Sequence, residues 1–322
     1  MRIGVDIMGG DYAPAAPIEG AILALKSLGS KSEIVLIGDE TLIRSELQAR
    51  GQSPEAFSIV HTDQVIGMEE SPTKAVASKP RATINVGIGM VKQQQLDGFV
   101  SAGNTGAMLV ASVMGLGKID GVMRPTIGAL VEIGEGRKAL LCDVGANVDC
   151  KPEVLMQFGI LARVFLESVH KIQNPRIGLM NVGEEEGKGP EAVKAAHQLM
   201  KSTDKFQFIG NVEGRDIYRG HADAYVCDGF TGNVVLKFGE SMYELLKSRF
   251  PSDDFIETFN FENYGGVPVL GVKGISIIGH GISTAKAVES MILSAVMAAE
   301  GNLVAKIQAA FASFQSDNPI IV

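Results

Sequence analysis

The segment Gly98-Phe99-Val100-Ser101-Ala102-Gly103-Asn104-Thr105-Gly106-Ala107 decides the fold, because a glycine-rich turn in it joins a short apolar run to a helical segment. The run Gly98–Ser101 has the length and composition of a buried strand, and Thr105–Leu116 has the length of a helix. The same alternation recurs along the chain. It predicts βαβ units around a mostly parallel sheet, and hence a three-layer α/β/α sandwich.

The expected strands are Ile3–Asp6, Ile34–Ile37, Phe57–His61, Gly98–Ser101, Ile127–Val131, Ala139–Asp143, Ile177–Asn181, Gln207–Gly210 and Ala224–Cys227. The expected helices are Ala16–Ser27, Leu42–Arg50, Arg81–Gln95, Thr105–Leu116, Pro152–Val169, Pro190–Ser202, Asn233–Arg249 and Thr284–Phe314. No linker, low-complexity tract or repeat interrupts them, which favours a single catalytic domain over residues 1–322. The stretch Arg249–Gly271 lacks periodic apolar residues, so we expect a short projecting accessory element there.

Composition excludes several classes of protein. A net charge of -8 and the absence of a Lys/Arg-rich run argue against nucleic-acid binding, which needs a basic face. The three cysteines lack metal-ligand spacing and indicate reduced thiols. Met1–Asp6 does not resemble a signal peptide, and no apolar run reaches the roughly 18 residues of a membrane span. We therefore expect a cytoplasmic, soluble protein.

Polar residues cluster directly after the expected strands. In open parallel sheets the ligand crevice lies at the carboxyl ends of the strands, so these clusters should converge on one edge. The first cluster runs from Asp6 to Asp11 and contains Gly9 and Gly10, which would let the backbone approach a ligand closely. It lacks the spacing of a dinucleotide fingerprint. A tight turn with a helix-capping acid remains the alternative.

Two further clusters have the composition of anion-binding turns at helix N-termini. One supplies Ser101, Gly103, Asn104 and Thr105, and the other supplies Asp228, Thr231, Gly232 and Asn233. Their similarity suggests one ligand held from both sides. The alternative is ordinary capping of two helices.

Two more clusters follow strands. In Asp143–Asp149 the acids cannot hold phosphate directly, but Asp143 and Asn147 could orient neighbouring donors. The segment from Asn181 to Gly189 resembles a P-loop but has one residue too few and no hydroxyl after Lys188, which excludes an ATPase. What remains is the cation of Lys188. Two more candidates to contact substrate are Asn211, after another strand, and His280, between two glycines.

Seven segments in collinear order resemble the bacterial phosphate acyltransferases of phospholipid synthesis. These are MRIGVDIMGGDYAP, SAGNTGA, LLCDVGANVDCKPE, NVGEEEGKG, FIGNVEGRD, DGFTGN and NYGG, and the resemblance runs from residue 1 to about residue 300. It implies reversible formation of acyl-phosphate from long-chain acyl-acyl carrier protein and inorganic phosphate. It also implies a fold akin to phosphotransacetylases and isocitrate or isopropylmalate dehydrogenases, with no metal or organic cofactor.

The resemblance also carries site residues and partners. The family's important lysine and asparagine fall on Lys188 and Asn233. The implied partners are the carrier protein, a second copy of the chain in a homodimer, and a membrane glycerol-3-phosphate acyltransferase that consumes the product. The family's longer, partly apolar excursion before NYGG is short and acidic here at Arg249–Ile256. We therefore expect any membrane association to run through the partner.

The chemistry fits these residues. A thioester is already activated and phosphate is a fair nucleophile, so the protein has to position the reactants and stabilise an oxyanion. An isocitrate-type dehydrogenase is disfavoured by the missing dinucleotide spacing, and a non-catalytic acyl-carrier or lipid-binding regulator is the other alternative. Docking of an acidic carrier would need a basic patch, for which the candidates are Arg81, Arg124, Arg137 and Lys138.

Overall fold

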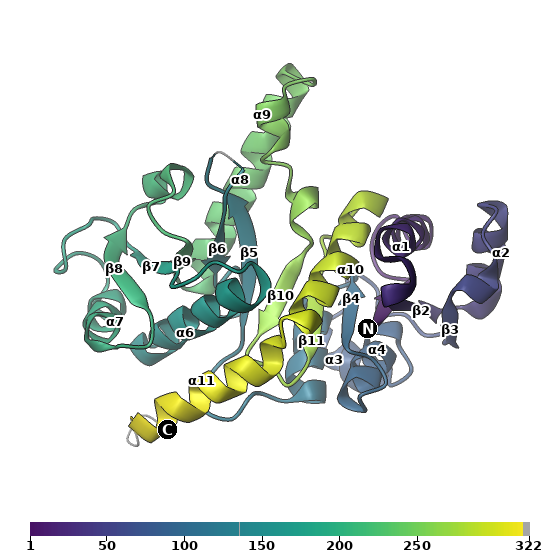
Figure 1. Cartoon of the computed structure of the whole chain (residues 1–322), viewed down its shortest axis with the longest axis horizontal. Coiled ribbons are helices and arrows are strands. Elements are labelled where there is room, and N and C mark those ends of the chain that lie inside the picture. Colours follow the sequence, from purple (N-terminus) through teal and green to yellow (C-terminus); the bar gives the residue numbers. More distant parts are fainter. Residues whose placement is uncertain (135, 318–322) are drawn as a thin grey trace. The chain divides into compact units, whose positions relative to one another are not determined.

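The computed structural model describes residues 1–134 and 136–317, which form two compact units (Figure 1). Unit 1 comprises Met1–Gly117 and Glu262–Gly301, and unit 2 comprises Lys118–Phe261 together with the chain from Asn302 onward. Each unit is described by itself. The single catalytic domain and the accessory element at 249–271 stay predictions.

The sheet of unit 1 is parallel except at one edge. Its strand order is β3-β2-β1-β4-β11-β10, and only β10 runs antiparallel to its neighbour. Ile3 of β1 pairs with Ile34 on one side and Gly98 on the other, and all three are buried. The strands are β1 (Arg2–Asp6), β2 (Glu33–Gly38), β3 (Ser58–His61), β4 (Gly98–Ser101), β10 (Val267–Leu270) and β11 (Ile275–Ile278).

Helices cover both faces of this sheet. The helices are α1 (Ala15–Leu28), α2 (Glu40–Ala49), α3 (Pro72–Ser78), α4 (Thr83–Lys92), α5 (Thr105–Ala111) and α10 (Ala285–Glu300). A side chain at Gly98 would point to Ala295 of α10, whereas the Phe99 ring packs against Gly87 of α4. Successive residues of a strand face opposite sides, so α4 and α10 lie on opposite faces.

The strands of unit 2 follow the order β5-β6-β9-β7-β8, and they are parallel except for one neighbouring pair. β5 and β6 form an antiparallel hairpin, so β5 begins at the edge where β6, β9 and β7 end. The strands are β5 (Thr126–Glu132), β6 (Lys138–Cys142), β7 (Arg176–Met180), β8 (Gln207–Val212) and β9 (Ala224–Val226). The helices are α6 (Pro152–Val169), α7 (Glu191–Ser202), α8 (Gly229–Arg249), α9 (Asp254–Glu257) and α11 (Leu303–Asp317).

The predicted α/β architecture with a mostly parallel sheet and flanking helices is confirmed, and all nine expected strands are present. Two strands were missed: β10, which lies within the expected accessory stretch, and β11. The helix expected over Thr284–Phe314 is wrong as a single element. It is two helices, because Asn302 takes a left-handed backbone with φ 52° after Gly301.

The start of α8 also differs from expectation. The helix begins at Gly229 rather than Asn233, because the Asp228 side chain accepts a hydrogen bond from the Thr231 amide and caps it. Thr231 and Gly232 therefore belong to the first turn of the helix.

Within the described residues, no single helix has both the length and the apolar content to cross a membrane. The bent pair Ala285–Glu300 and Leu303–Ser316 passes that test by length and composition only.

His170 should make the stability of unit 2 depend on pH. It follows α6 and meets the Phe165 ring edge-on, with the ring centroids 5.2 Å apart. Burial, and then the nearby charge of Lys138, lower the pKa of His170 to about 4 from 6.5. The helix C-terminus favours the charged ring by only about 0.3–1 kcal/mol, less than the roughly 3 kcal/mol that this pKa shift represents.

The folded-state pKa lies below the unfolded one, so this stability is present above pH 6.5 and is lost as pH falls from about 6.5 towards 4. We expect His170→Phe to remove up to about 3 kcal/mol of the fall in unfolding free energy across that interval. Urea titrations at pH 7.5, 6, 5 and 4 measure it. Equal falls in variant and wild type would contradict this role.

Candidate functional site

In unit 1, Asp6 joins the turns that follow β1 and β4. Its buried carboxylate accepts hydrogen bonds from Ser101 Oγ at 2.7 Å and the Met8 amide at 3.0 Å. Ser101 Oγ in turn accepts from the Gly103 amide at 3.0 Å. Burial raises the pKa of Asp6, and the hydrogen bond from Ser101 opposes that shift. The carboxylate therefore fixes the two glycine turns relative to each other.

Two glycines let these turns approach closely. A Cβ at Gly9 would lie 2.6 Å from Asp6 Oδ2 and 2.7 Å from the Gly103 amide nitrogen. Gly10 has φ +99°, and a Cβ there would lie 3.1 Å from the carbonyl oxygen of Gly281. The turn that carries His280 thus adjoins Gly10. Unit 1 brings together six predicted residues: Asp6, Gly9, Gly10, Ser101, Gly103 and His280.

The side chain of Asn104, in the turn after β4, caps a helix and holds a neighbouring loop. Its Oδ1 accepts from the Ala107 amide at 3.0 Å and caps α5, while its Nδ2 donates to the carbonyl oxygens of Gly67, Met68 and Glu70. The amide thus ties a neighbouring loop to the helix. Thr105, by contrast, is exposed.

In unit 2, Asp143 is the centre of a buried network at the carboxyl end of β6. Its Oδ1 accepts from Thr126 Oγ1 and the Ile127 amide, both at 3.0 Å, and from the Ala146 amide at 3.3 Å. Its Oδ2 accepts from the backbone amide and the side-chain amide of Asn147, at 2.5 and 3.1 Å. Burial raises the pKa of Asp143 and these hydrogen bonds oppose the shift. Asp143 and Asn147 therefore shape the loop from within.

The first turn of α8 packs directly on that loop. The Gly229 amide donates to the Asn147 carbonyl oxygen at 2.7 Å. A Cβ at Gly232 would overlap the carbonyl oxygen of Asp143. Asp228 accepts from both the amide and the hydroxyl of Thr231, at 2.8 and 3.0 Å. The Thr231 amide and hydroxyl are thus engaged within the turn.

Asn233 is the exposed polar side chain of this turn. It lies beside the loop after β6, since a Cβ at Gly145 would be 3.7 Å from Asn233 Oδ1. Gly145 has φ +126°, a conformation that glycine adopts readily. The amide of Asn233 is therefore open to a ligand.

Lys188 projects from a loop that two asparagines hold. Asn181 Nδ2 donates to the Lys188 carbonyl oxygen, and Asn211 Nδ2 donates to that of Glu185, both at 2.9 Å. Asn211 Oδ1 lies 2.9 Å from Nδ1 of the buried His197. Lys188 itself is exposed, and no carboxylate within residues 1–134 and 136–317 pairs with its ammonium group. The asparagines position the loop and leave the lysine available.

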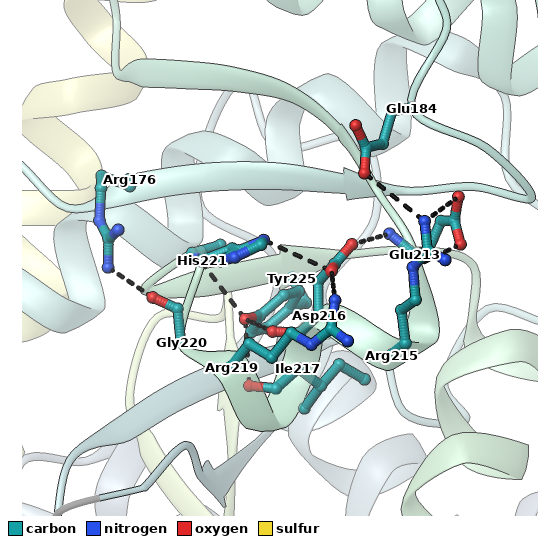
Figure 2. A network of polar contacts seen from close by, with 11 residues as sticks. Arg176, Glu184, Glu213, Arg215, Asp216, Ile217, Arg219, Gly220, His221 and Tyr225 are labelled. Carbon is teal, nitrogen blue, oxygen red and sulfur yellow. Dashed lines mark hydrogen bonds and ion pairs between the residues drawn. The ribbon is translucent and has the colours of Figure 1, made fainter.

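Figure 2 shows that the same loop is tied to the segment after β8. Arg215 lies 3.7 Å from Glu184 of the loop and 3.1 Å from Glu213. Asp216 is buried beneath, where its Oδ2 accepts from the Glu213 amide. Sequence reasoning did not single out Arg215, and it gave His197 a structural or surface role. Neither stood out, because Arg215 is a lone exposed cation and His197 lies in an ordinary helical segment.

The adjacent cysteines are not reactive. Cys142, Cys150 and Cys227 are free and buried. Burial raises the pKa of Cys150 to about 12 and also raises those of Cys142 and Cys227, so these thiols stay protonated near neutral pH.

Of the four cations considered for carrier docking, three lie in unit 2 and one lies in unit 1. Arg124 is exposed just before β5, at the edge where β6 ends. Arg137 and Lys138 lie at the start of β6, at the opposite edge of the sheet. Arg81 belongs to unit 1 and pairs with Asp63 at 3.1 Å. Of the three in unit 2, Arg124 is the one at the edge of the sheet where the loop with Asn147 and the start of α8 with Asn233 lie.

Comparisons with known proteins agree with this architecture. The fold is that of a phosphotransacetylase: EutD phosphotransacetylase from Staphylococcus aureus superposes with a TM-score of 0.63 at 14% identity, with 94% of each chain covered. A phosphotransacetylase from Streptococcus pyogenes gives 0.62 at 17% identity, over 98% of this chain and 94% of that one. These likenesses define the fold class as α/β.

The family follows from the sequence relatives. The family model described as "Fatty acid synthesis protein" matches residues 1–306. "Phosphate acyltransferase" of Chlorobaculum parvum is 44% identical over 322 residues, covering 92% of this chain and 94% of the relative. "Phosphate acyltransferase" of Salinibacter ruber is 42% identical over 332 residues, covering 97% and 98%. The chain belongs to this family of fatty acid synthesis proteins, the phosphate acyltransferases, and is a transferase.

Proposed function

We propose that this enzyme transfers the acyl group of a long-chain acyl-acyl carrier protein to inorganic phosphate, reversibly, in phospholipid biosynthesis. One observation carries the proposal. Lys188, on the loop after β7, and Asn233, at the start of helix α8 after β9, match the family's lysine and asparagine, and both are exposed. β7 and β9 are parallel neighbours, so the segments that follow them leave from the same edge of the sheet, where ligands of open parallel sheets bind.

The reaction needs charge stabilisation more than a strong base. A phosphate oxygen attacks the thioester carbonyl carbon, the C–S bond breaks, and the carrier leaves as a thiolate that takes up a proton. A phosphate ester has a second pKa of about 6, so much of the inorganic phosphate is dianionic at neutral pH. Lys188 offsets the charge of phosphate, and Asn233 donates to the oxyanion that forms on the former carbonyl oxygen.

Other predicted residues support this site. Asp143, Asn147, Asp228 and Thr231 hold the first turn of α8, and Asn181 and Asn211 hold the lysine loop. Within unit 1, the cluster of Asp6, Ser101 and Gly103, with Gly9 and Gly10, has close-packed glycine turns of a kind that suits phosphate contact. No organic cofactor or metal has a step in the proposed reaction.

The proposal extends to partners and location. The acylated carrier protein is the donor, and the exposed Arg124 offers it a cation beside the site. The chain works as a homodimer in the cytoplasm. A membrane glycerol-3-phosphate acyltransferase consumes the acyl-phosphate and can bring the enzyme to the membrane surface.

The test is acyl-phosphate formation by the purified protein. Palmitoyl-acyl carrier protein and palmitoyl-coenzyme A are compared, each with and without phosphate. Phosphate-dependent product from the carrier donor is the expected result. Preference for coenzyme A would move the enzyme towards the phosphotransacetylases, and no product from either donor would overturn the proposal.

A further inference from the structure

A buried histidine lies at the start of a chain of hydrogen bonds that reaches the lysine loop, residues 181–190. His197 of α7 is 3% exposed, and its ring meets Phe208 of β8 edge-on, with the ring centroids 5.1 Å apart. Its Nδ1 lies 2.9 Å from Oδ1 of Asn211, which is buried near the end of β8. Packing therefore fixes the ring in a position that presents Nδ1 to Asn211.

The proton of this hydrogen bond belongs to the histidine. Asn211 Nδ2 donates to the Glu185 carbonyl oxygen at 2.9 Å, so Oδ1 of the same amide faces the ring. An amide oxygen only accepts, and the reversed amide would place Oδ1 against the Glu185 carbonyl oxygen, where neither atom can donate. His197 therefore donates through Nδ1 and fixes the orientation of the Asn211 amide.

The chain of hydrogen bonds ends at the backbone of Lys188. The Glu185 carbonyl oxygen accepts from Asn211 Nδ2 and from the Lys188 amide, the latter at 3.1 Å, so both of its lone pairs are used. A second tie is the ion pair between Glu186 of the lysine loop and Lys201 of α7, at 2.6 Å. Exposed ion pairs contribute little, so the buried chain is the stronger restraint on the lysine loop.

We propose that His197 is a positioning residue of the transferase reaction. By orienting the Asn211 amide, it sets where the lysine loop presents Lys188 to the substrate. The inference rests on the proposed function and adds to it a residue that touches no reacting atom. The alternative is that the His197 ring only fills space between α7 and β8, and the experiment separates the two roles.

The experiment compares His197→Asn with His197→Leu. Asparagine keeps an N–H donor near the position of Nδ1, whereas leucine fills the space without a donor. We expect kcat for acyl-phosphate formation to fall about 10–100-fold in His197→Leu, because a misplacement of about 1 Å can cost about 10²-fold. In His197→Asn it should stay within about threefold of wild type. If packing alone mattered, the order would be reversed, because asparagine leaves a space beside Phe208.

Three further variants sharpen the test. His170→Leu makes the same substitution at the half-buried histidine that follows α6, and it should leave kcat within about twofold. In a Lys188→Ala background, His197→Leu should change kcat by less than about twofold, because a residue that acts through Lys188 loses its effect with the ammonium group. Asn211→Asp keeps an acceptor for the ring but loses the donor to Glu185, so it should match the loss in His197→Leu. It replaces His197→Leu if that variant does not fold.

Hydrogen exchange of the Lys188 amide gives a measurement that does not depend on turnover. We expect faster exchange in His197→Leu and unchanged exchange in His197→Asn. Normal turnover in His197→Leu, equal losses in His197→Leu and His197→Asn, or an undiminished effect in the Lys188→Ala background would overturn the inference while the proposed function stands. If the wild type forms no acyl-phosphate, the proposed function fails. Faster exchange would then show only that His197 holds the loop, and its role in turnover fails as well.

Discussion

Lys188→Ala and Asn233→Ala are each expected to lower kcat for acyl-phosphate formation by about 10²–10³, the usual cost of removing one oxyanion donor. Both side chains are exposed, and neither functional group is needed to hold its loop, since Asn181, Asn211 and Asp228 do that. Their removal should therefore change unfolding free energy by less than about 0.5 kcal/mol. Steady-state kinetics and thermal unfolding measure the two effects.

Lys194→Ala is the matched control for the lysine. Lys194 lies in α7, where it pairs with Glu191 at 2.8 Å, so its removal deletes the same charge outside the site. We expect nearly wild-type kcat from this control. Near-normal turnover in both Lys188→Ala and Asn233→Ala would sink the assignment of these residues to the reaction.

The sequence predicted the fold because the determining signals are local. Buried strands such as Ile34–Ile37 are apolar runs between turns, and no longer-range information is needed to recognise them. β10 and β11 were not predicted from the sequence, because glycines flank both strands. In addition, Pro268 lies inside β10, and proline is untypical of a strand interior. The break between α10 and α11 depends on the backbone of Asn302, which no periodicity reveals.

The sequence indicated where polar clusters fall but not what each side chain does. Asp143 and Asn104 looked like rim residues, yet their polar atoms turn inward to backbone groups of distant segments. Such pairings depend on how strands and loops are placed, which spacing along the chain does not encode. The partner of His197 could not be predicted for the same reason, because this hydrogen bond forms only when Asn211 of another element lies against the ring.

This inward use of polar groups gives the site its rigidity. Asp143 accepts a hydrogen bond from the buried Ile127 amide, which would otherwise be unsatisfied at a cost of about 1–3 kcal/mol, and Asp228 accepts one from the half-buried Thr231 amide. Because these acids hold the turns, the side chains of Lys188 and Asn233 are not needed to stabilise them and can face solvent. A preorganised site of this kind should respond sharply to any change that separates α8 from the loop after β6.

Gly232→Ala is a substitution that should move α8 away from the loop after β6. A methyl group at Gly232 would overlap the Asp143 carbonyl oxygen and lie 2.9 Å from Cys227 Sγ, so α8 must move away. Overpacking costs about 3 kcal/mol at such a site, while the helix preference for alanine over glycine returns about 1 kcal/mol. We expect a net loss of about 2 kcal/mol in unfolding free energy, measured by urea titration.

The same substitution at Gly89, in α4 with open space around it, should instead stabilise the protein by up to about 1 kcal/mol. Equal midpoints for Gly232→Ala and wild type would mean that α8 does not pack on Asp143 as described, and the positioning of Asn233 would then need another cause.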